Sequence, residues 1–408
     1  MVYNKFSEYL KRKYGAKVYK LPVNLCVSCP NRDRGIGYVF AEADNITQRD
    51  SAVSDARSIA IDSTCTDRGD TAAYHGSSGS TCTDRGSTDA YHGSSGSGST
   101  CTDRGGTDAY HGNSDSTCAE RGGILKSSSS GGCIFCGDEG AGFEMLSSDK
   151  SVISQLESNR RYIGAKYGAE KFIAYFQNYS NTYLPFSIFA KTMEEACTKG
   201  IVALYISTRP DCIDDRRVNF LRRLKEEKGV DIVLELGLQS VNHHTMRWLN
   251  RGHGLAEFID AVLRIKGVGL EVCTHMINDL PADDIHDVIE GAKVLSALGT
   301  DQVKCHSLYI LENTVLGKVY NDGSFIPLGM DEFIERTICF LEYLSPDIVV
   351  QRLIGRAPAE RTLFCNWDTS WWKIHDAIVD KMLREGRYQG RISGYLNGSA
   401  LKGVDERL

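Results

Sequence analysis

From residue 150 onward, short apolar runs alternate with longer amphipathic segments, and this alternation constrains the fold more than any other feature. Runs that predict strands lie at 171–177, 201–207, 231–239, 270–277 and 302–311, with an earlier one near 17–25. Helix patterns lie near 150–167, 186–199, 213–228, 254–267 and 283–298. Such alternation favours a parallel sheet, so the sequence predicts an α/β fold, a partial (β/α)6 barrel of the TIM type. A strand and helices near 345–390 are expected to close or flank this barrel.

Polar residues cluster where these predicted strands end. The clusters are Gln177 to Thr182, Ser207 to Asp211, Gln239 with Ser240, His275 to Asp279, and Lys304 with His306. One polar residue after a strand usually belongs to a turn or a helix cap. In a parallel barrel, however, all these positions meet at one rim, where such enzymes carry their chemistry. Five clusters therefore predict a shared site.

Fourteen cysteines in a chain of 408 residues indicate reduced thiols, metal ligands or core residues more than a disulfide scaffold. Two C-x2-C pairs stand out, Cys26/Cys29 and Cys133/Cys136. Four thiolates can hold a structural zinc ion, although 103 residues lie between Cys29 and Cys133, far more than in a compact zinc knuckle. Three thiolates can instead hold an iron–sulfur cluster. The spacing leaves both readings open.

Two segments on either side of this gap, CPNRD at 29–33 and GGCIFCGDEGAGFE at 131–144, resemble the two halves of the cluster loop of radical S-adenosylmethionine (radical SAM) proteins. Further segments are similar, in order, to the YhcC-type family: AYFQNYSNTY at 174–183, STRPDC at 207–212, LELGLQS at 234–240, LNRGH at 249–253 and CTHMINDLP at 273–281. The likeness runs through about residues 4–33 and 131–390. The family is similar in its core to the radical-generating domain of the Elongator catalytic subunit.

This resemblance implies an enzyme with a [4Fe-4S] cluster, held by Cys29, Cys133 and Cys136, that cleaves S-adenosylmethionine reductively and abstracts a hydrogen atom from its substrate. Phe135 is expected to pack near the adenine or to anchor the loop. The candidates for S-adenosylmethionine or substrate contacts are Gln177, Asn178, Tyr179, Thr208, Arg209 and Gln239. The implied partners are a reductant protein, such as a flavodoxin or a ferredoxin, and a substrate that is RNA or a small molecule.

The chain departs from the family pattern within the cluster loop. Where the family has a short Gly-rich connection, residues 34–130 hold Ser/Gly-rich repeats around STCTDRG, which lack an apolar face to bury. They carry 8 basic and 13 acidic residues, hence most of the formal net charge of -6. The predicted organisation is a radical SAM core at 1–33 and 131–390, a disordered insertion at 34–130, and a tail at 391–408. Cys26 stands where the family has a small residue that is not a ligand.

The N-terminal segment gives a weaker signal. Its lysines and tyrosines interleave over the first twenty residues and could hold RNA through phosphate contacts and stacking, or could form an exposed basic helix and strand edge. No run of about 18 apolar residues and no signal peptide is apparent, which favours a cytoplasmic protein without a membrane segment.

Two functions of other classes remain as alternatives. A zinc-stabilised scaffold would use Cys26, Cys29, Cys133 and Cys136 without redox chemistry. An enzyme-dead interaction protein would keep the barrel and lose its cluster to the insertion.

Overall fold

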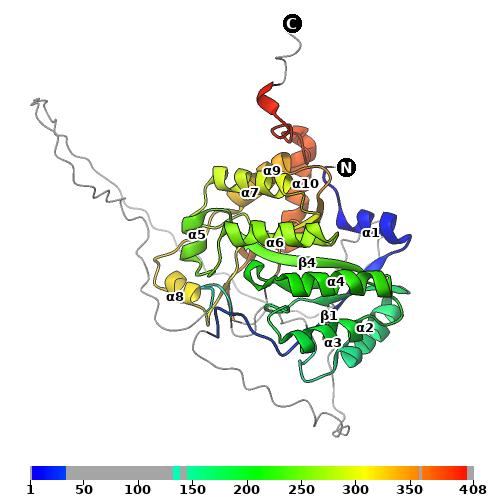
Figure 1. The fold of residues 1–408 in the computed structure, drawn as a ribbon. Helices are drawn as coiled ribbons and strands as arrows, with labels where there is room; N and C mark the ends of the chain where they lie inside the picture. Colours follow the sequence, from blue (N-terminus) through cyan, green and yellow to red (C-terminus); the bar gives the residue numbers. More distant parts are fainter. Residues whose placement is uncertain (1, 34–131, 138–144, 358–360, 402–408) are drawn as a thin grey trace, which may run out of the picture. The chain divides into compact units, whose positions relative to one another are not determined.

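The computed structural model describes residues 2–33, 132–137, 145–357 and 361–401. The central element is a parallel sheet of seven strands in the order β1-β2-β3-β4-β5-β6-β8 (Figure 1). Its strands are β1 (Val18–Val23), β2 (Lys171–Phe176), β3 (Ile201–Thr208), β4 (Asp231–Gln239), β5 (Glu271–Ile277), β6 (Gln302–His306) and β8 (Val349–Arg352). This confirms the predicted α/β partial barrel.

Side chains from strands that are far apart in the strand order meet inside the barrel, which shows how strongly the sheet curls. Lys20 on β1 donates to Gln351 Oε1 on β8 at 2.7 Å. Lys304 on β6 donates to the hydroxyl of Tyr175 on β2, also at 2.7 Å. Strands that are four or six places apart in a flat sheet could not make these contacts, because neighbouring strands are about 4.8 Å apart.

Several of the connecting helices begin or end where the sequence supplies caps. They are α2 (Val152–Tyr167), α3 (Phe186–Ala196), α4 (Asp215–Lys228), α5 (His243–Trp248), α6 (Leu255–Gly267), α7 (Ile285–Ala297), α8 (Val315–Asn321), α9 (Met330–Tyr343) and α10 (Trp371–Glu385). Asp214, for example, accepts a hydrogen bond from Arg217 N at the start of α4, and Gly229 ends that helix with φ 65°. A left-handed residue at this position favours glycine, which has no Cβ.

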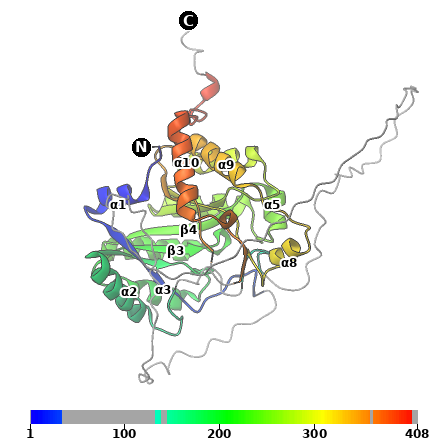
Figure 2. The ribbon, with the colours of Figure 1, turned by 180° about the vertical axis from the view of Figure 1, so that it is seen from behind.

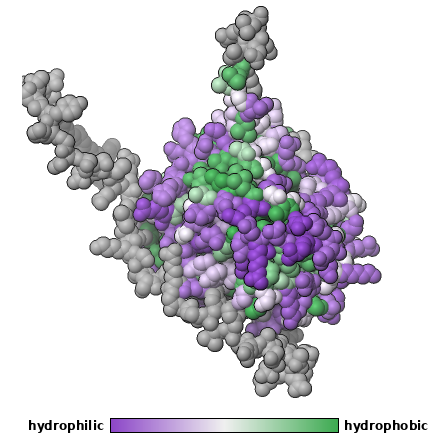
Figure 3. Space-filling view, viewed as in Figure 1, coloured by the Kyte–Doolittle hydropathy of each residue, from purple (hydrophilic) through white to green (hydrophobic). Residues whose placement is uncertain are grey.

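In Figure 1, α2, α3, α4 and α6 lie in front of the sheet, and Figure 2 shows the strands from the other side. The surface of this helical layer is largely hydrophilic (Figure 3). Alternation along each strand divides the apolar residues into two cores. Phe176 packs in the core between sheet and helices, whereas the preceding residue, Tyr175, packs in the core inside the barrel.

The inner core is closed at the amino-terminal end of the strands by α1 (Phe6–Tyr14). Phe6 and Leu10 from α1 belong to the inner core, and Val350 N on β8 donates to Asn4 O at 2.8 Å just before the helix. The N-terminal segment therefore completes the barrel at the gap between β1 and β8. No helix of the described residues is long and apolar enough to cross a membrane.

The N-terminal lysines and tyrosines divide between the barrel and the surface: Lys11, Arg12 and Lys17 are exposed, as the basic-helix alternative expects, and an RNA contact stays a prediction. Tyr3 and Tyr19 are buried, and Lys20 is 7% exposed inside the barrel. Lys13 pairs with Asp231 and Glu271, which also receive hydrogen bonds from Tyr14 and Tyr9. Packing and ion pairs at the closed end of the barrel therefore use the tyrosines, Lys13 and Lys20, whereas Lys11, Arg12 and Lys17 stay exposed.

Two further predictions differ from the structure or fall outside it. The single strand predicted at 302–311 is two, because Ser307 to Tyr309 turn away from the sheet after β6, and β7 (Ile310–Leu311) pairs antiparallel with β9 (Thr362–Phe364). The predicted disordered insertion at 34–130 lies outside the described residues, as do residues 402–408 of the predicted tail.

Candidate active site

Three cysteines line one cavity at the carboxyl ends of the strands. Cys29 follows β1, and Cys133 and Cys136 belong to the loop at 132–137. The Cys29 thiol lies 3.1 Å from Ser180 Oγ, in the loop after β2. Cys26 is exposed and does not line the cavity. The structure thus brings together the three cysteines that the sequence predicts as cluster ligands.

The two halves of the cysteine-bearing loop are held together by polar contacts through the segment after α5. Asn31 donates to Asn250 O at 2.5 Å, and Asn250 donates to Gly132 O at 2.6 Å. Arg32 donates directly to Gly137 O at 2.8 Å. Gly252 lies so close that an added Cβ would be 2.1 Å from Asn31 Oδ1, and its φ is 72°. Glycine is therefore required at this position by both space and backbone conformation.

Two arginines give this end of the cavity its positive charge. Arg251 donates to Cys133 Sγ at 3.2 Å. Hydrogen bonding from the Cys136 thiol, together with the charges of Arg251 and Arg209, holds the pKa of Cys133 below its usual value, although burial opposes this. Burial raises the pKa of Cys29. The hydrogen bond to Cys133, followed by burial, raises the pKa of Cys136 well above its usual value. A thiolate is the form of cysteine that binds metal, so Cys133 is the thiol that the two arginines favour as a thiolate.

The spacing of the thiols is informative about the kind of metal centre. Sulfurs in a tetrahedral zinc site are about 3.8 Å apart, because each Zn–S bond is about 2.3 Å. Among the described residues, the cysteines form no group of three or more whose sulfurs all lie within 4.8 Å of one another. The arrangement therefore does not favour a preformed zinc site, whereas a cluster of several iron atoms needs sulfurs farther apart.

Most of the other predicted site residues line the same cavity. Gln177 and Tyr179 follow β2, Thr208 and Arg209 lie at the end of β3, and Gln239 ends β4. Tyr179 and Gln239 have positive φ values, 49° and 76°.

One predicted contact residue, Asn178, is placed differently, whereas Phe135 fits the loop-anchor alternative. Asn178 is absent from the cavity lining and donates to Asn24 at 3.4 Å. Phe135 lines the cavity and also packs on a small apolar cluster around Leu308, so it serves as a loop anchor at the cavity wall.

Arg209 is held rigidly and keeps one group available. Its Nε and Nη2 donate to the two carboxylate oxygens of Asp211, at 2.8 and 2.7 Å. The residue is 4% exposed, and its Nη1 is buried with no hydrogen-bond partner among the described residues. A buried guanidinium N–H without a partner is costly, which suits a group that meets a ligand.

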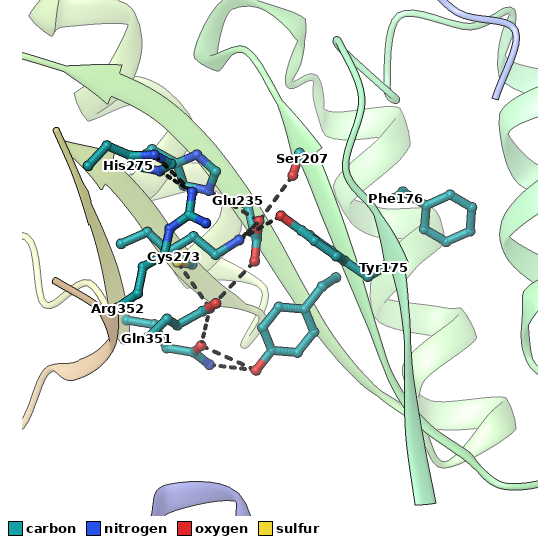
Figure 4. Close-up of polar contacts among 12 residues, drawn as sticks. Tyr175, Phe176, Ser207, Glu235, Cys273, His275, Gln351 and Arg352 are labelled. Carbon is teal, nitrogen blue, oxygen red and sulfur yellow. Dashed lines mark hydrogen bonds and ion pairs between the residues drawn. The ribbon is translucent and has the colours of Figure 1, made fainter. Parts of the chain in front are cut away.

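Below the thiols, a buried charge network forms the floor of the cavity (Figure 4). Glu235 on β4 is 0% exposed. Its Oε2 accepts from Lys304 at 2.5 Å and from Ser207 at 3.0 Å, and its Oε1 lies 3.4 Å from Lys20. Figure 4 shows Tyr175 pointing into this group and the next residue, Phe176, pointing away.

The charges of Lys20 and Lys304 shift the pKa of Glu235, and that of Lys304 also shifts the pKa of His275. Burial alone would raise the pKa of Glu235, but the charges of Lys20 and Lys304 hold it well below its usual range. Burial lowers the pKa of Lys20 to about 8. Burial and then the charge of Lys304 lower the pKa of His275 to about 4, so its imidazole is neutral near pH 7.

Sequence reasoning missed several residues of the site. Arg251 and Asn250 lie in the LNRGH segment, but their contacts are with residues far away in the sequence. Arg352 ends β8, and the polar pair Gln351 and Arg352 at the end of that apolar run is a signal that could have found it. Glu235 carried a usable signal, because a charged residue in the middle of an apolar strand is normally paired.

Comparisons with known proteins show what the chain is similar to. The model of the radical SAM superfamily matches residues 130–295, and that of the Radical_SAM C-terminal domain matches residues 300–384. The chain is 31% identical to the uncharacterized protein YtqA of Bacillus subtilis, over 64% of this chain and 81% of YtqA. It is 26% identical to protein YhcC of Escherichia coli, over 65% of this chain and 84% of YhcC.

Among solved structures, the archaeal Methanocaldococcus infernus Elp3 with an N-terminal deletion superposes with a TM-score of 0.51 at 20% identity, covering 59% of this chain and 60% of that chain. At this level of identity the likeness concerns the fold, a curled parallel sheet with outer helices.

Proposed function

The chain belongs to the radical SAM superfamily and is an enzyme whose cofactors are a [4Fe-4S] cluster and S-adenosylmethionine, and we propose that Cys29, Cys133 and Cys136 hold the cluster. The observation that carries the proposal is the meeting of these three thiols at one cavity, although Cys29 is far from the other two in the sequence. When bound and reduced by one electron, these cofactors supply a 5′-deoxyadenosyl radical that abstracts a hydrogen atom from the substrate.

The chain's own residues have three tasks in this reaction. Arg251 and Arg209 offset the negative charge of the thiolates, since both lower the pKa of Cys133. The loop contacts of Asn31 and Asn250 hold the two halves of the cysteine-bearing loop in place. The cavity walls shield the reacting groups from water, which prevents side reactions.

We assign the polar strand ends on β2, β3 and β4 to S-adenosylmethionine. Gln177, Thr208 and Gln239 offer amide and hydroxyl groups on the wall beside Cys29, and the unpartnered Nη1 of Arg209 is available to a carboxylate. Amides and hydroxyls bind both donors and acceptors, as an amino acid group requires. Tyr179 and Phe135 supply aromatic surface in the same lining. Asn178 supports the loop from behind, through Asn24.

The electron donor is proposed to be a flavodoxin or a ferredoxin. The substrate is proposed to enter the cavity from the rim formed by the carboxyl ends of the strands. An RNA substrate stays a prediction, and the N-terminal tyrosines that first suggested it are mostly engaged in packing and internal hydrogen bonds.

Anaerobic reconstitution tests this assignment. The wild-type protein is expected to bind about four irons per chain and, once reduced, to release 5′-deoxyadenosine from S-adenosylmethionine. Cys29→Ala, Cys133→Ala and Cys136→Ala should each lose the cluster. Cys26→Ala is the matched control, because its thiol is exposed and outside the cavity, and it should keep the iron. Stoichiometric zinc without iron in the wild-type protein, or loss of iron in Cys26→Ala, would contradict the assignment.

A further inference from the structure

Four arginines line the cavity, and three of them have an evident role. Arg209 pairs with Asp211, and Arg251 donates to the Cys133 sulfur. Arg32 donates to a backbone carbonyl of the cysteine-bearing loop. Arg352, at the end of β8, is the fourth, and neither the cluster nor the loop accounts for it.

Arg352 contacts a neutral partner. Its Nη2 lies 2.8 and 3.0 Å from the two ring nitrogens of His306. Burial and then the charge of Arg352 hold the pKa of His306 well below its usual range, so the imidazole is neutral. Among the described residues, no carboxylate lies within ion-pair distance of Arg352, and its Nε is buried without a hydrogen-bond partner. An arginine cannot lose its proton to relieve this cost.

The strand register explains why other residues cannot neutralise Arg352. His275 pairs with Lys304 across β5 and β6, and Lys304 pairs with Arg352 across β6 and β8. Residues paired in this way project to the same face of the sheet, so two cations stand side by side. Glu235 compensates Lys304 and also faces Lys20. Among the described residues, the floor thus contains one carboxylate, that of Glu235, and three basic side chains, those of Lys20, Lys304 and Arg352.

A bound metal ion does not explain the same group. Glu235, Cys273 and His275 place their ligand atoms within 4.8 Å of one another. However, Lys304 and Ser207 already donate to the Glu235 oxygen that His275 contacts. A cation would have to displace a lysine from its counter-charge and would face two further basic side chains. The excess charge of the floor is positive, so it favours an anion.

We propose that Arg352 binds an anionic oxyacid group of the substrate, a carboxylate or a phosphate, with the imidazoles of His275 and His306 beside it. The two rings lie 5.3 Å apart between their centroids. Figure 4 shows Arg352 extending from its strand toward His275, and both residues line the cavity. A guanidinium presents paired N–H groups that match both kinds of anion.

This proposal rests on the proposed function, because it assigns the anion to the substrate and not to S-adenosylmethionine. The proposed binding positions of S-adenosylmethionine and of the substrate anion lie on different strands. The residues assigned to S-adenosylmethionine end β2, β3 and β4, whereas Arg352 ends β8, beyond β5 and β6 in the strand order. The substrate would thus be held by its charged group on one wall, with its remaining part facing the other.

Calorimetric titration of the anaerobic, iron-loaded protein tests the proposal, with sodium phosphate and sodium acetate as probes at constant ionic strength. At least one anion should bind saturably, and the stronger one identifies the group as phosphate or carboxylate. Arg352→Gln should weaken that binding by at least about tenfold, the usual effect of losing a charged hydrogen bond. Arg352→Lys, which keeps the charge, should lose less. Arg222→Gln is the matched control, because Arg222 pairs with Glu226 on the outer surface.

A second measurement needs no variant. In the wild-type protein, the dissociation constant of S-adenosylmethionine should be unchanged by saturating phosphate or acetate. Competition between the anion and S-adenosylmethionine would show that Arg352 belongs to the S-adenosylmethionine site and would overturn the proposal. Failure of the wild-type protein to bind either anion, or full binding by Arg352→Gln, would overturn it as well. Failure of the proposed function itself would appear separately, as absent iron or absent 5′-deoxyadenosine.

Discussion

The two ends of the cavity balance their charges in different ways. At the thiol end, arginines face cysteines on loops that are joined mainly through backbone carbonyls. At the floor, Glu235 is buried among lysines on rigid strands, and the network is complete within the chain except at Arg352. The floor should therefore control the stability of the folded barrel. The thiol end should control how well the cofactor is retained.

The largest expected effect is at the floor. Glu235→Ala removes the counter-charge of Lys20 and Lys304 and should lower the free energy of unfolding by about 3–5 kcal/mol, the usual cost of breaking a buried ion pair. Urea denaturation of the metal-free protein measures this. Glu226→Ala breaks an exposed pair with Arg222 and, as the control, should cost less than about 1 kcal/mol. Equal losses in the two variants would show that the floor does not stabilise the barrel.

An intermediate effect is expected at the thiol end. Gly252→Ala places a methyl group against Asn31 and should lower both the stability and the iron content after reconstitution. Gly269→Ala is the matched control: its φ is 74°, close to the 72° of Gly252, but no atom lies within 4 Å of the added Cβ. Both variants thus strain the backbone, and only Gly252→Ala also crowds a neighbouring side chain. We expect Gly252→Ala to cost about 1–3 kcal/mol more than the control.

If both glycine variants retain iron equally, close contact between the two halves of the loop is not what holds the cofactor. That result would also remove the contrast between the two ends of the cavity.

The smallest effect is expected from shortening the cysteine-bearing loop. Replacing residues 34–130 with a short Gly-rich linker should leave iron content and S-adenosylmethionine cleavage near wild-type levels. The ends to be joined are close, since a Cβ on Gly132 would lie 3.4 Å from Arg32 Cγ. Closing a shorter loop should favour cluster binding by about 2 kcal/mol if the segment is flexible. Loss of iron in this variant would show that residues 34–130 have a folded role.

The sequence predicted the strands and helices well because their patterns are local. The six strands from β1 to β6 begin, and the helices α2, α3, α4, α6 and α7 fall, within a few residues of their predicted positions, whereas the short helix α5 was not predicted. The error at 302–311 is instructive. The polar pair Lys304 and His306 lies inside the run predicted as one strand, and β6 in fact ends at His306, so this pair marked the strand end that the prediction placed at residue 311. At the N-terminus, the exposed lysines of α1 follow from local pattern, whereas the pairing of Lys13 does not, because its partners Asp231 and Glu271 are distant in sequence.

In the candidate site, too, some features follow from local sequence and others from tertiary contacts. The sequence by itself determined the three cysteines, the polar strand ends and the family, because motifs and strand periodicity are written in consecutive residues. Only the tertiary structure decided that Lys20 and Lys304 share Glu235, that Gly252 closes on Asn31, and that Arg352 faces the cavity without a counter-charge. These relations depend on how far the sheet curls. Curling brings β1 beside β8 across the barrel, and side chains separated by hundreds of residues then set one another's charge.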